Sequence, residues 1–394
     1  MDRCVQVAWL DGRQAIAKQN NFIFSPLCLR AGLALLAAGT HGPTLRQLLD
    51  FLVSEHTSHL DAASAKLHAS IRAWPQVSFA AGVFVDRTIS LTPEFESTAT
   101  SAHAAVARPV DFRNRPAAAI AELNDFIERA TAGRMRNLVS PDKVGRSTKV
   151  VLASGMHFKA TWARRFDPED TVRGVFHRGL GGDGFTSSVR VPFLSDPGMH
   201  YAESFDGPDL GFKVLQCFYK MTGRDGRLDP RAPCFCMLVF LPHDDARDDG
   251  LARLLRLAVT EPDFVMRCVP RRQQAARPGF RFDFDARAAL RQLGLAAPFD
   301  RRDADLSGMV ANAPPEGLYV SAVGMACAVE VDEEGTTAVA AMYSPSSPTY
   351  SPIETPPPPP MSFVADHPFM FAIVEYEKGD VLFLGHVMDP SKES

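Results

Sequence analysis

The stretch EVDEEGTTAVAAMYSPSSPTYSPIETPPPPPMSFVADHPF, from Glu330 to Phe369, changes character twice along its length. It begins with acidic residues and a glycine, continues through small side chains, and becomes a Ser/Pro/Tyr tract that contains five consecutive prolines. Hydrophobic sequence then resumes at once. Small side chains can enter a β-sheet, whereas proline lacks the amide hydrogen that a central strand donates. The stretch therefore joins a segment that can become a strand to a segment that stays irregular.

The composition of the chain limits what the protein can be. The 394 residues are 46% hydrophobic and 22% charged, which is enough to build a large core. The net charge of -4 gives no argument for nucleic acid or an anionic membrane as a partner. There is no apolar run long enough to span a membrane and no signal-peptide pattern. We expect a monomer in the cytoplasm or nucleocytoplasm, with the extracellular space, reached by an unconventional route, as the alternative.

No catalytic or metal-binding pattern stands out. The seven cysteines are an odd number in a chain without a signal-peptide pattern, which favours reduced, buried thiols. Cys234 and Cys236 lie in the apolar run CFCMLVFLP, where they are expected to pack as small hydrophobic residues rather than bind a metal. His56 and His59 fall in a polar stretch after a predicted helix. Because no nucleophile, base and orienting group are recognisable, we expect no enzyme, no metal and no cofactor.

The first half of the chain is predicted to be mainly helical. A short strand ends at Phe24, and Ser25 with Pro26 begins an apolar helix. Thr44 and Gln47 have the spacing of a capping box at the start of a second helix. Residues 120–139 form an amphipathic pattern that predicts a further helix.

The second half is predicted to be largely β. From residue 149, apolar runs are separated by Gly, Pro and Asp clusters, as in antiparallel strands. The glycines of GLGGDGF, residues 179–185, are interpreted as a hairpin turn, because no helix follows them to bind a phosphate. Helical sequence returns at 249–258 and 286–300, and the last two strands flank a Lys-Gly-Asp turn. Helices grouped early and strands grouped late predict an α+β fold.

Many motifs, in order along nearly the whole chain, resemble the serpin family and most closely its plant members. They are NFIFSPLCLRAGLALLAAG, VDF, LNDFIERATAGRMRNLV, LASGMHFKATWARRFDP, VRVPFL, LVFLP, LGLAAPFDRRDADLSGM, GLYVSAV, EVDEEGTTAVAAM and FVADHPFMFAIVE. The resemblance implies one α+β serpin domain over 1–394, with three β-sheets, about nine helices and an exposed reactive-centre loop. The hinge and the loop, with its Pro-rich insertion, are expected over 333–361.

The resemblance also implies a suicide-substrate mechanism. A protease cleaves the loop and forms an acyl-enzyme, and the N-terminal part of the loop then inserts into a central sheet and distorts the protease. Counting along the loop as in the family places the reactive bond between Thr349 and Tyr350. The expected targets are chymotrypsin-like or elastase-like serine proteases, with papain-like cysteine proteases as a second class. The alternative is a non-inhibitory serpin (a binding, storage or diverged protein) whose loop is cleaved without trapping.

The hinge has side chains suited to such an insertion. If Thr336 faces inward, its alternate partners Ala338 and Ala340 are small, and Gly335 can turn without a Cβ. Pro345 and Pro348 oppose insertion, because each lacks an amide hydrogen. Slow insertion would let the acyl-enzyme hydrolyse. The hinge comprises Glu333, Glu334, Gly335, Thr336, Thr337, Ala338, Val339, Ala340 and Ala341.

Opening of the central sheet depends in the family on a hydrogen-bonded cluster called the shutter. Carried over residue by residue, its positions are Ser25, Cys28, Ser154 and Met325, where the family has serine, serine, asparagine and histidine. Three of these four polar residues are therefore changed. The motif FKATW also departs from the family, because Ala160 replaces a glycine. These changes favour the non-inhibitory alternative.

The Pro-rich part of the loop has two further interpretations. The pentaproline Pro356–Pro360 is expected to be a tolerated surface insertion, and a polyproline ligand for an aromatic groove is the alternative. The segment YSPSSPTYSP resembles one repeat of an RNA polymerase tail, which we interpret as a coincidence of composition. Proline-directed phosphorylation is the alternative there.

Overall fold

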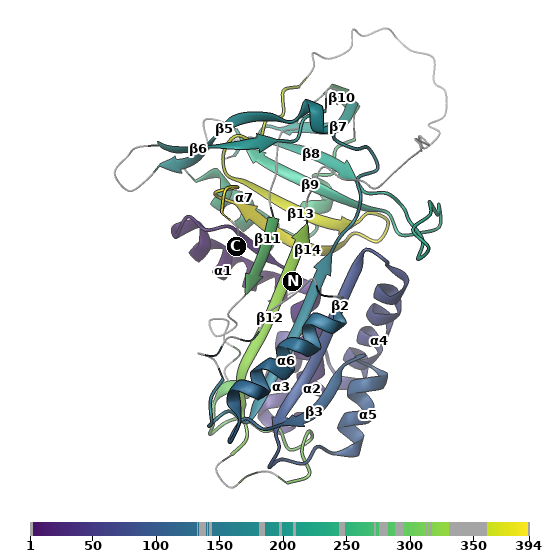
Figure 1. Ribbon diagram of the computed structural model, residues 1–394, viewed down its shortest axis with the longest axis vertical. Coiled ribbons are helices and arrows are strands. Elements are labelled where there is room, and N and C mark those ends of the chain that lie inside the picture. The colour runs from purple at the N-terminus through teal and green to yellow at the C-terminus, as the bar shows by residue number, and fades with distance from the viewer. Residues whose placement is uncertain are drawn as a thin grey trace.

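The computed structural model describes residues 3–392 except 132, 134–138, 140, 142–143, 181–185, 197–198, 208–209, 244–248, 272, 276–282, 288–294, 296, 313, 315–316 and 331–360. Within these residues the chain forms eight α-helices and three β-sheets. In Figure 1 one sheet crosses the upper half of the molecule, and the long strands of another run down the lower half. The predicted α+β fold with three sheets is confirmed, and eight described helices are close to the nine expected.

The helices lie mostly in the first third of the chain, as predicted. They are α1 (Arg3–Ala17), α2 (Pro26–Ala38), α3 (Gly42–Phe51), α4 (Thr57–Ala73), α5 (Pro93–Ser101), α6 (Pro116–Ala130), α7 (Gly250–Thr260) and α8 (Phe264–Arg267). Short 3-10 turns occur at Pro168–Asp170 and Ala297–Phe299. None of the helices in the described part of the chain has the length and apolar character needed to cross a membrane.

The upper sheet has seven strands. Their order is β1 (Phe22–Phe24), β14 (Asp380–Val387), β13 (Phe369–Glu375), β9 (Phe235–Pro242), β8 (Phe212–Phe218), β7 (Met199–Phe205) and β10 (Gln273–Ala275). The predicted hairpin around Lys378-Gly379-Asp380 is confirmed as β13 and β14, and Gly379 has a φ of 77° that suits a glycine. Because β13 lies between β9 and β14, the C-terminal hairpin is an internal part of the sheet.

The lower sheet has five strands, in the order β11 (Asp283–Arg287), β12 (Val320–Glu330), β4 (Val150–Phe158), β2 (Val77–Asp86) and β3 (Val106–Val110). The third sheet consists of β5 (Val172–Leu180) and β6 (Thr186–Phe193), which pair antiparallel up to Leu180 and Thr186. This pairing confirms the hairpin predicted from the glycine-rich segment. Residues 181–185 between the two strands lie outside the described residues.

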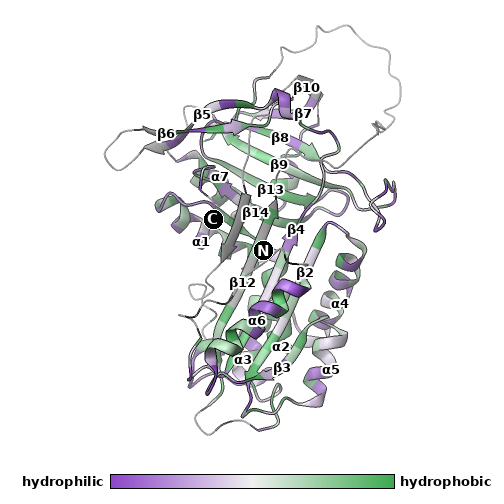
Figure 2. Ribbon diagram, viewed as in Figure 1, coloured by the Kyte–Doolittle hydropathy of each residue, from purple (hydrophilic) through white to green (hydrophobic). Residues whose placement is uncertain are grey.

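The five-stranded sheet is covered on both faces. The main hydrophobic core contains α2 and one face of β4, including Leu152 and Met156. A second core, on the opposite face, joins α6 to β2 and β4 through residues such as Phe84, Leu123 and Val151. Alternate residues of β4 therefore face different cores, as the period of two in a strand requires. Figure 2 shows the contrast between the hydrophobic strands β8 and β9 and the hydrophilic residues carried by α4 and α6.

Two local predictions were wrong because contacts with distant segments replace the expected local ones. Thr44 lies within α3, where its hydroxyl donates to the carbonyl of Asp303 at 3.0 Å and accepts from the amide of Asp305 at 2.9 Å. The Gln47 side chain accepts from the amide of Ala297 at 2.8 Å, so these residues form no capping box. The helix expected over 286–300 is contradicted at its start, where 286–287 belong to β11, and at 297–299, which form a 3-10 turn. Most of the rest of that range lies outside the described residues.

A buried histidine makes the stability of the fold depend on pH. His386 is fully buried beside the Phe22 ring, and its Nε2 lies 3.2 Å from the carbonyl of Asn20. Burial lowers the pKa of His386 from 6.5 to about 4. Between these values the unfolded chain binds a proton that the folded protein does not, so the free energy of unfolding falls as the pH falls.

We expect His386→Gln to reduce the fall in the free energy of unfolding between pH 6.5 and 4, because glutamine cannot take up the proton. The contribution of the single histidine is at most about 3 kcal/mol, at roughly 1.4 kcal/mol for each pKa unit. Urea unfolding of both proteins at pH 7, 5.5 and 4.5 would measure it. Equal losses of stability in the two proteins would contradict the assignment.

Candidate functional site

The seam between β4 and β12 is the feature on which an inserting strand would act. The two strands are direct neighbours and run parallel, with nine register pairs from Val320 and Val150 to Val329 and Phe158. β12 ends at Glu330, directly before the loop. A strand that turned back from this end would be antiparallel to both β12 and β4. Antiparallel pairs are slightly more stable per residue than parallel ones, so the closed seam can gain by admitting such a strand.

Beneath the seam the structure brings the four shutter positions together. Ser25 and Cys28 belong to the start of α2, Ser154 lies on β4, and Met325 lies on β12 as the register partner of Ser154. The Ser25 hydroxyl accepts from the amide of Cys28 at 3.2 Å and thereby caps α2. The same hydroxyl donates to the sulfur of Met156 at 3.4 Å. All of these residues are almost completely buried.

Two of the four predicted shutter positions, Cys28 and Met325, carry sulfur, and Ser25 and Ser154 carry hydroxyls. The Cys28 thiol donates to the Ser154 hydroxyl at 3.6 Å, which is a weak bond because S–H is a poor donor. Met325 is 2% exposed, belongs to the main hydrophobic core, and offers only a thioether to its neighbours. The region under the seam is therefore largely apolar, held by packing and a few weak bonds rather than by a strong polar network.

The motif FKATW lies at the upper end of the seam. Phe158 ends β4 and packs edge-to-face against Tyr219 and Phe235, with ring centroids 5.0 and 5.4 Å apart. Trp162 stacks on Tyr219 at 4.3 Å. This aromatic group lies close to the end at which the loop leaves β12.

The predicted hinge and reactive bond lie outside the described residues. They are Glu333, Glu334, Gly335, Thr336, Thr337, Ala338, Val339, Ala340, Ala341, Thr349 and Tyr350. The prolines of the loop, Pro345, Pro348 and 356–360, also lie outside them. The start of the loop is nevertheless fixed by Glu330, and its end leads into Met361 and the segment before β13.

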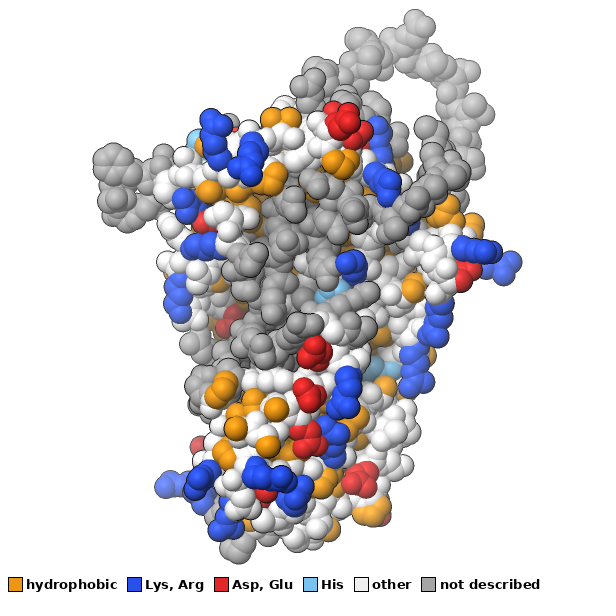
Figure 3. All heavy atoms as spheres, in the orientation of Figure 1, with side chains coloured by type: hydrophobic (Ala, Val, Ile, Leu, Met, Phe, Trp, Pro, Cys, Tyr) orange, Lys and Arg blue, Asp and Glu red, His pale blue; other side chains and the backbone are white. Residues whose placement is uncertain are grey.

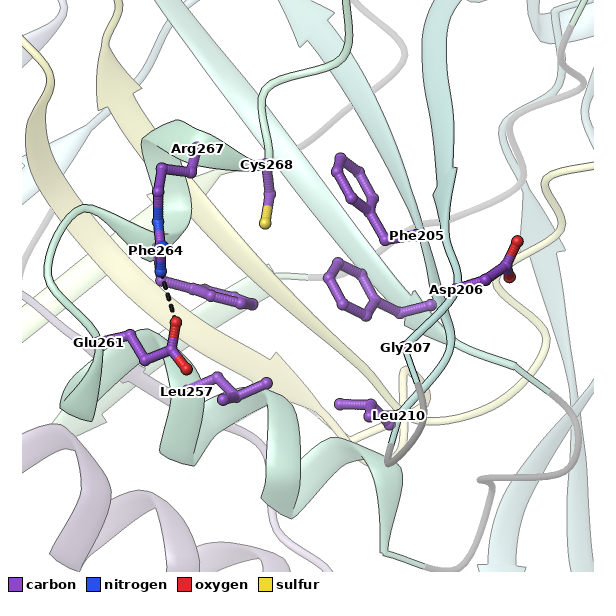
Figure 4. A pocket seen from close by; sticks show the side chains of 10 residues that line it. Phe205, Asp206, Gly207, Leu210, Leu257, Glu261, Phe264, Arg267 and Cys268 are labelled. Atoms are coloured by element: carbon purple, nitrogen blue, oxygen red, sulfur yellow. Dashed lines mark hydrogen bonds and ion pairs between the residues drawn. The ribbon is translucent and has the colours of Figure 1, made fainter.

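An open groove of about 430 Å³ lies on the seven-stranded sheet, lined by residues of α7, α8 and the β7–β8 hairpin (Figure 4). The Phe205 and Phe212 rings stack 5.2 Å apart, and Arg267 is paired with Glu261 beside them. Cys268 also lines the groove, but burial raises the pKa of its thiol to about 11. The thiol is protonated at neutral pH and is a poor nucleophile there. None of the lining residues that the structure describes belongs to β4 or β12, so the groove is separate from the seam.

The cysteines are free, as predicted, and all except Cys234 are buried. Burial raises the pKa of Cys234 to about 11 and that of Cys236 to about 12. Cys236 packs within the main core, as expected for a small hydrophobic residue. Among the described residues no cluster of His, Cys, Asp or Glu could hold a metal ion.

Met156 is a site residue that the sequence reasoning missed. It lies two positions after Ser154 on β4, so the alternation of the strand places both side chains on the same face. That spacing was the available signal. Tyr219 was missed as well, because its pairing with Trp162 joins segments distant in sequence.

Comparison with known proteins supports the geometry. The family model described as "Serpin (serine protease inhibitor)" matches residues 11–390. Two rice proteins align over the full length of both chains: "Putative non-inhibitory serpin-10" at 64% identity and "Putative non-inhibitory serpin-Z11" at 51%.

The solved structures agree with this match. The structure of Arabidopsis AtSerpin1 in its native stressed conformation superposes with a TM-score of 0.80 at 30% identity, covering all of both chains. The family model spans most of the sequence, and the relatives match it from end to end. The chain therefore belongs to the serpin family of serine protease inhibitors.

Proposed function

We propose that this serpin is cleaved in its loop as a substrate and does not trap the protease. The observation that carries the proposal is the sulfur-rich, largely apolar region under the β4–β12 seam, formed by Cys28, Met156 and Met325. The names of the two rice relatives describe non-inhibitory serpins and support the same conclusion.

The physical argument concerns the rate at which the seam opens. Admitting a strand moves β4 and β12 apart by about one additional strand spacing, 4.8 Å. The parallel ladder breaks before new bonds form, and the side chains under it lose their packing. The groups of a polar cluster can replace broken hydrogen bonds with new ones during this movement. A thioether such as that of Met325 is only a weak acceptor and cannot do so. A slow opening favours hydrolysis of the acyl-enzyme.

Inhibition of a serine protease is the second candidate, and the length of the seam favours it. The ladder between β4 and β12 has nine register pairs. Residues 336–344, from Thr336 to Ser344, supply nine residues without a proline. Pro345 would fall just beyond the ladder, so a strand that fills the described seam meets no missing amide. On this proposal the reactive bond lies between Thr349 and Tyr350, and the target is a chymotrypsin-like or elastase-like protease.

The two candidate functions predict different products after reaction with a protease. We expect chymotrypsin, elastase, trypsin or papain to cut the loop without a covalent complex that survives denaturing gel electrophoresis. N-terminal sequencing of the smaller fragment, separated on the denaturing gel, tests whether cleavage falls after Thr349 or Tyr350. We also expect the freshly cleaved protein to melt at the temperature of the intact one, because a slowly opening seam has not yet admitted the strand. A covalent band at the summed mass would establish the inhibitory candidate instead.

A gain of trapping would test the role of the shutter directly. We expect the triple variant Cys28→Ser, Ser154→Asn, Met325→His, which restores the polar residues of the family, to form a covalent complex that the natural chain does not. A control variant, Pro345→Ala with Pro348→Ala, changes only the loop and should remain a substrate. Trapping by the loop variant but not by the shutter variant would place the barrier in the prolines and overturn the argument from the seam.

A further inference from the structure

Helix α6 lies across the face of the five-stranded sheet opposite to α2 (Figure 1). Its buried residues Ile120, Leu123 and Ile127 form the second core with β2 and β4. That core also reaches β12. Ala322 packs against it, and Val151, the register partner of Ala322 on β4, belongs to it. Part of the seam is therefore covered by the core that attaches α6.

Arg108 joins α6 to the edge of this sheet. It lies on β3 as the register partner of Phe84 on β2, and its guanidinium carbon is 5.4 Å from the centre of the Phe84 ring. The same carbon is 6.0 Å from the ring of Phe126 on α6. Glu122, one turn earlier on α6, places a carboxylate oxygen 3.4 Å from Nη2 of Arg108. One side chain from β3 thus contacts both β2 and α6.

The contacts of Arg108 depend on α6 remaining in place. Its Nε and Nη2 atoms are buried and make no hydrogen bond to any residue that the structure describes, so the two rings and the nearby carboxylate offset their loss of water. The Phe84 and Phe126 rings also touch each other edge-to-face, with centroids 5.6 Å apart. If α6 moved away, Arg108 would lose one ring and the carboxylate together.

The rings contribute more to this attachment than the carboxylate does. Glu122 is 46% exposed, and an exposed ion pair of this kind contributes little to stability. Acidic and basic side chains are interspersed over this lower part of the surface (Figure 3), and dissolved salt screens such exposed pairs. A cation held against aromatic faces is favourable even at partly exposed sites.

We propose that Arg108 is a positioning residue that fastens α6 over the β4–β12 seam and so keeps the Ala322–Val151 part of the seam closed. We call the contacts of Arg108 with Phe84, Phe126 and Glu122 the clasp. Loss of the clasp frees α6, and the seam beneath it opens more often. The clasp acts on the sheet itself, so it goes beyond the proposed function and holds whether or not a protease is trapped.

Hydrogen exchange followed by mass spectrometry tests the clasp without a protease. We expect Arg108→Met, which keeps an apolar stem and removes the charge, to speed exchange roughly five-fold in α6, β4 and β12. Arg108→Lys should restore part of the protection, and Glu122→Gln should resemble the natural chain. The strands β13 and β14 serve as the internal reference, because a general loss of stability would speed their exchange equally.

A matched control separates the clasp from the loss of any arginine. Arg115 is 62% exposed, and its Nε lies 3.4 Å from Asp111, one turn away in sequence. Arg115→Met should leave exchange at the seam unchanged. Faster exchange confined to α6, or equal changes in the seam and in β13–β14, would overturn the proposal.

A second measurement follows the opening of the seam directly. A synthetic peptide with the sequence of residues 336–344 has the nine residues that match the ladder. We expect it to anneal to Arg108→Met several-fold faster than to the natural chain, as resolved by native gel electrophoresis. Equal rates in the two proteins, including no annealing in either, would count against the clasp.

Discussion

The parallel pairing of β4 with β12 is the constraint on which the rest of the molecule depends. Parallel neighbours cannot be joined by a tight turn, and here they come from distant parts of the chain, residues 150–158 and 320–330. The loop follows β12 directly, so it begins at an end of the seam from which an antiparallel strand could enter between them. This parallel pairing could therefore be replaced by two antiparallel pairings, each slightly more stable per residue, provided that β4 and β12 can separate.

Whether they separate is decided on both faces of the sheet. On one face lie Cys28, Ser154 and Met325, where the Cys28 thiol makes one weak hydrogen bond and Met325 offers only a thioether. On the other face α6 is attached by its own core, which reaches Ala322 of the seam, and by Arg108 at the edge of the sheet. The two faces restrain opening in different ways, because one holds the strands from below by packing and the other covers them with a helix that must move.

Local features of the fold could be predicted from the sequence, whereas pairings between distant segments could not. Ser25 and Pro26 predict the start of α2, and a continuous apolar run predicts β4, because these signals arise within one element. Thr44 and Gln47 were misassigned because their partners lie some 250 residues away along the chain. Arg108 looks in the sequence like an ordinary charge on an edge strand. Only the approach of Phe84 and Phe126 from two other elements gives it a role.

The position of β13 and β14 determines what a cut in the loop can release. The residues after Thr349 include both strands, and β13 is hydrogen-bonded to β9 on one side and to β14 on the other. Beyond β14, the Asn21 side chain accepts from the amides of Met388 and Asp389, and Arg178 pairs with the Asp389 carboxylate at 2.9 Å. A nicked molecule thus remains one particle made of two chains. Cleavage breaks the chain without releasing a peptide. Both new chain ends remain part of the folded protein.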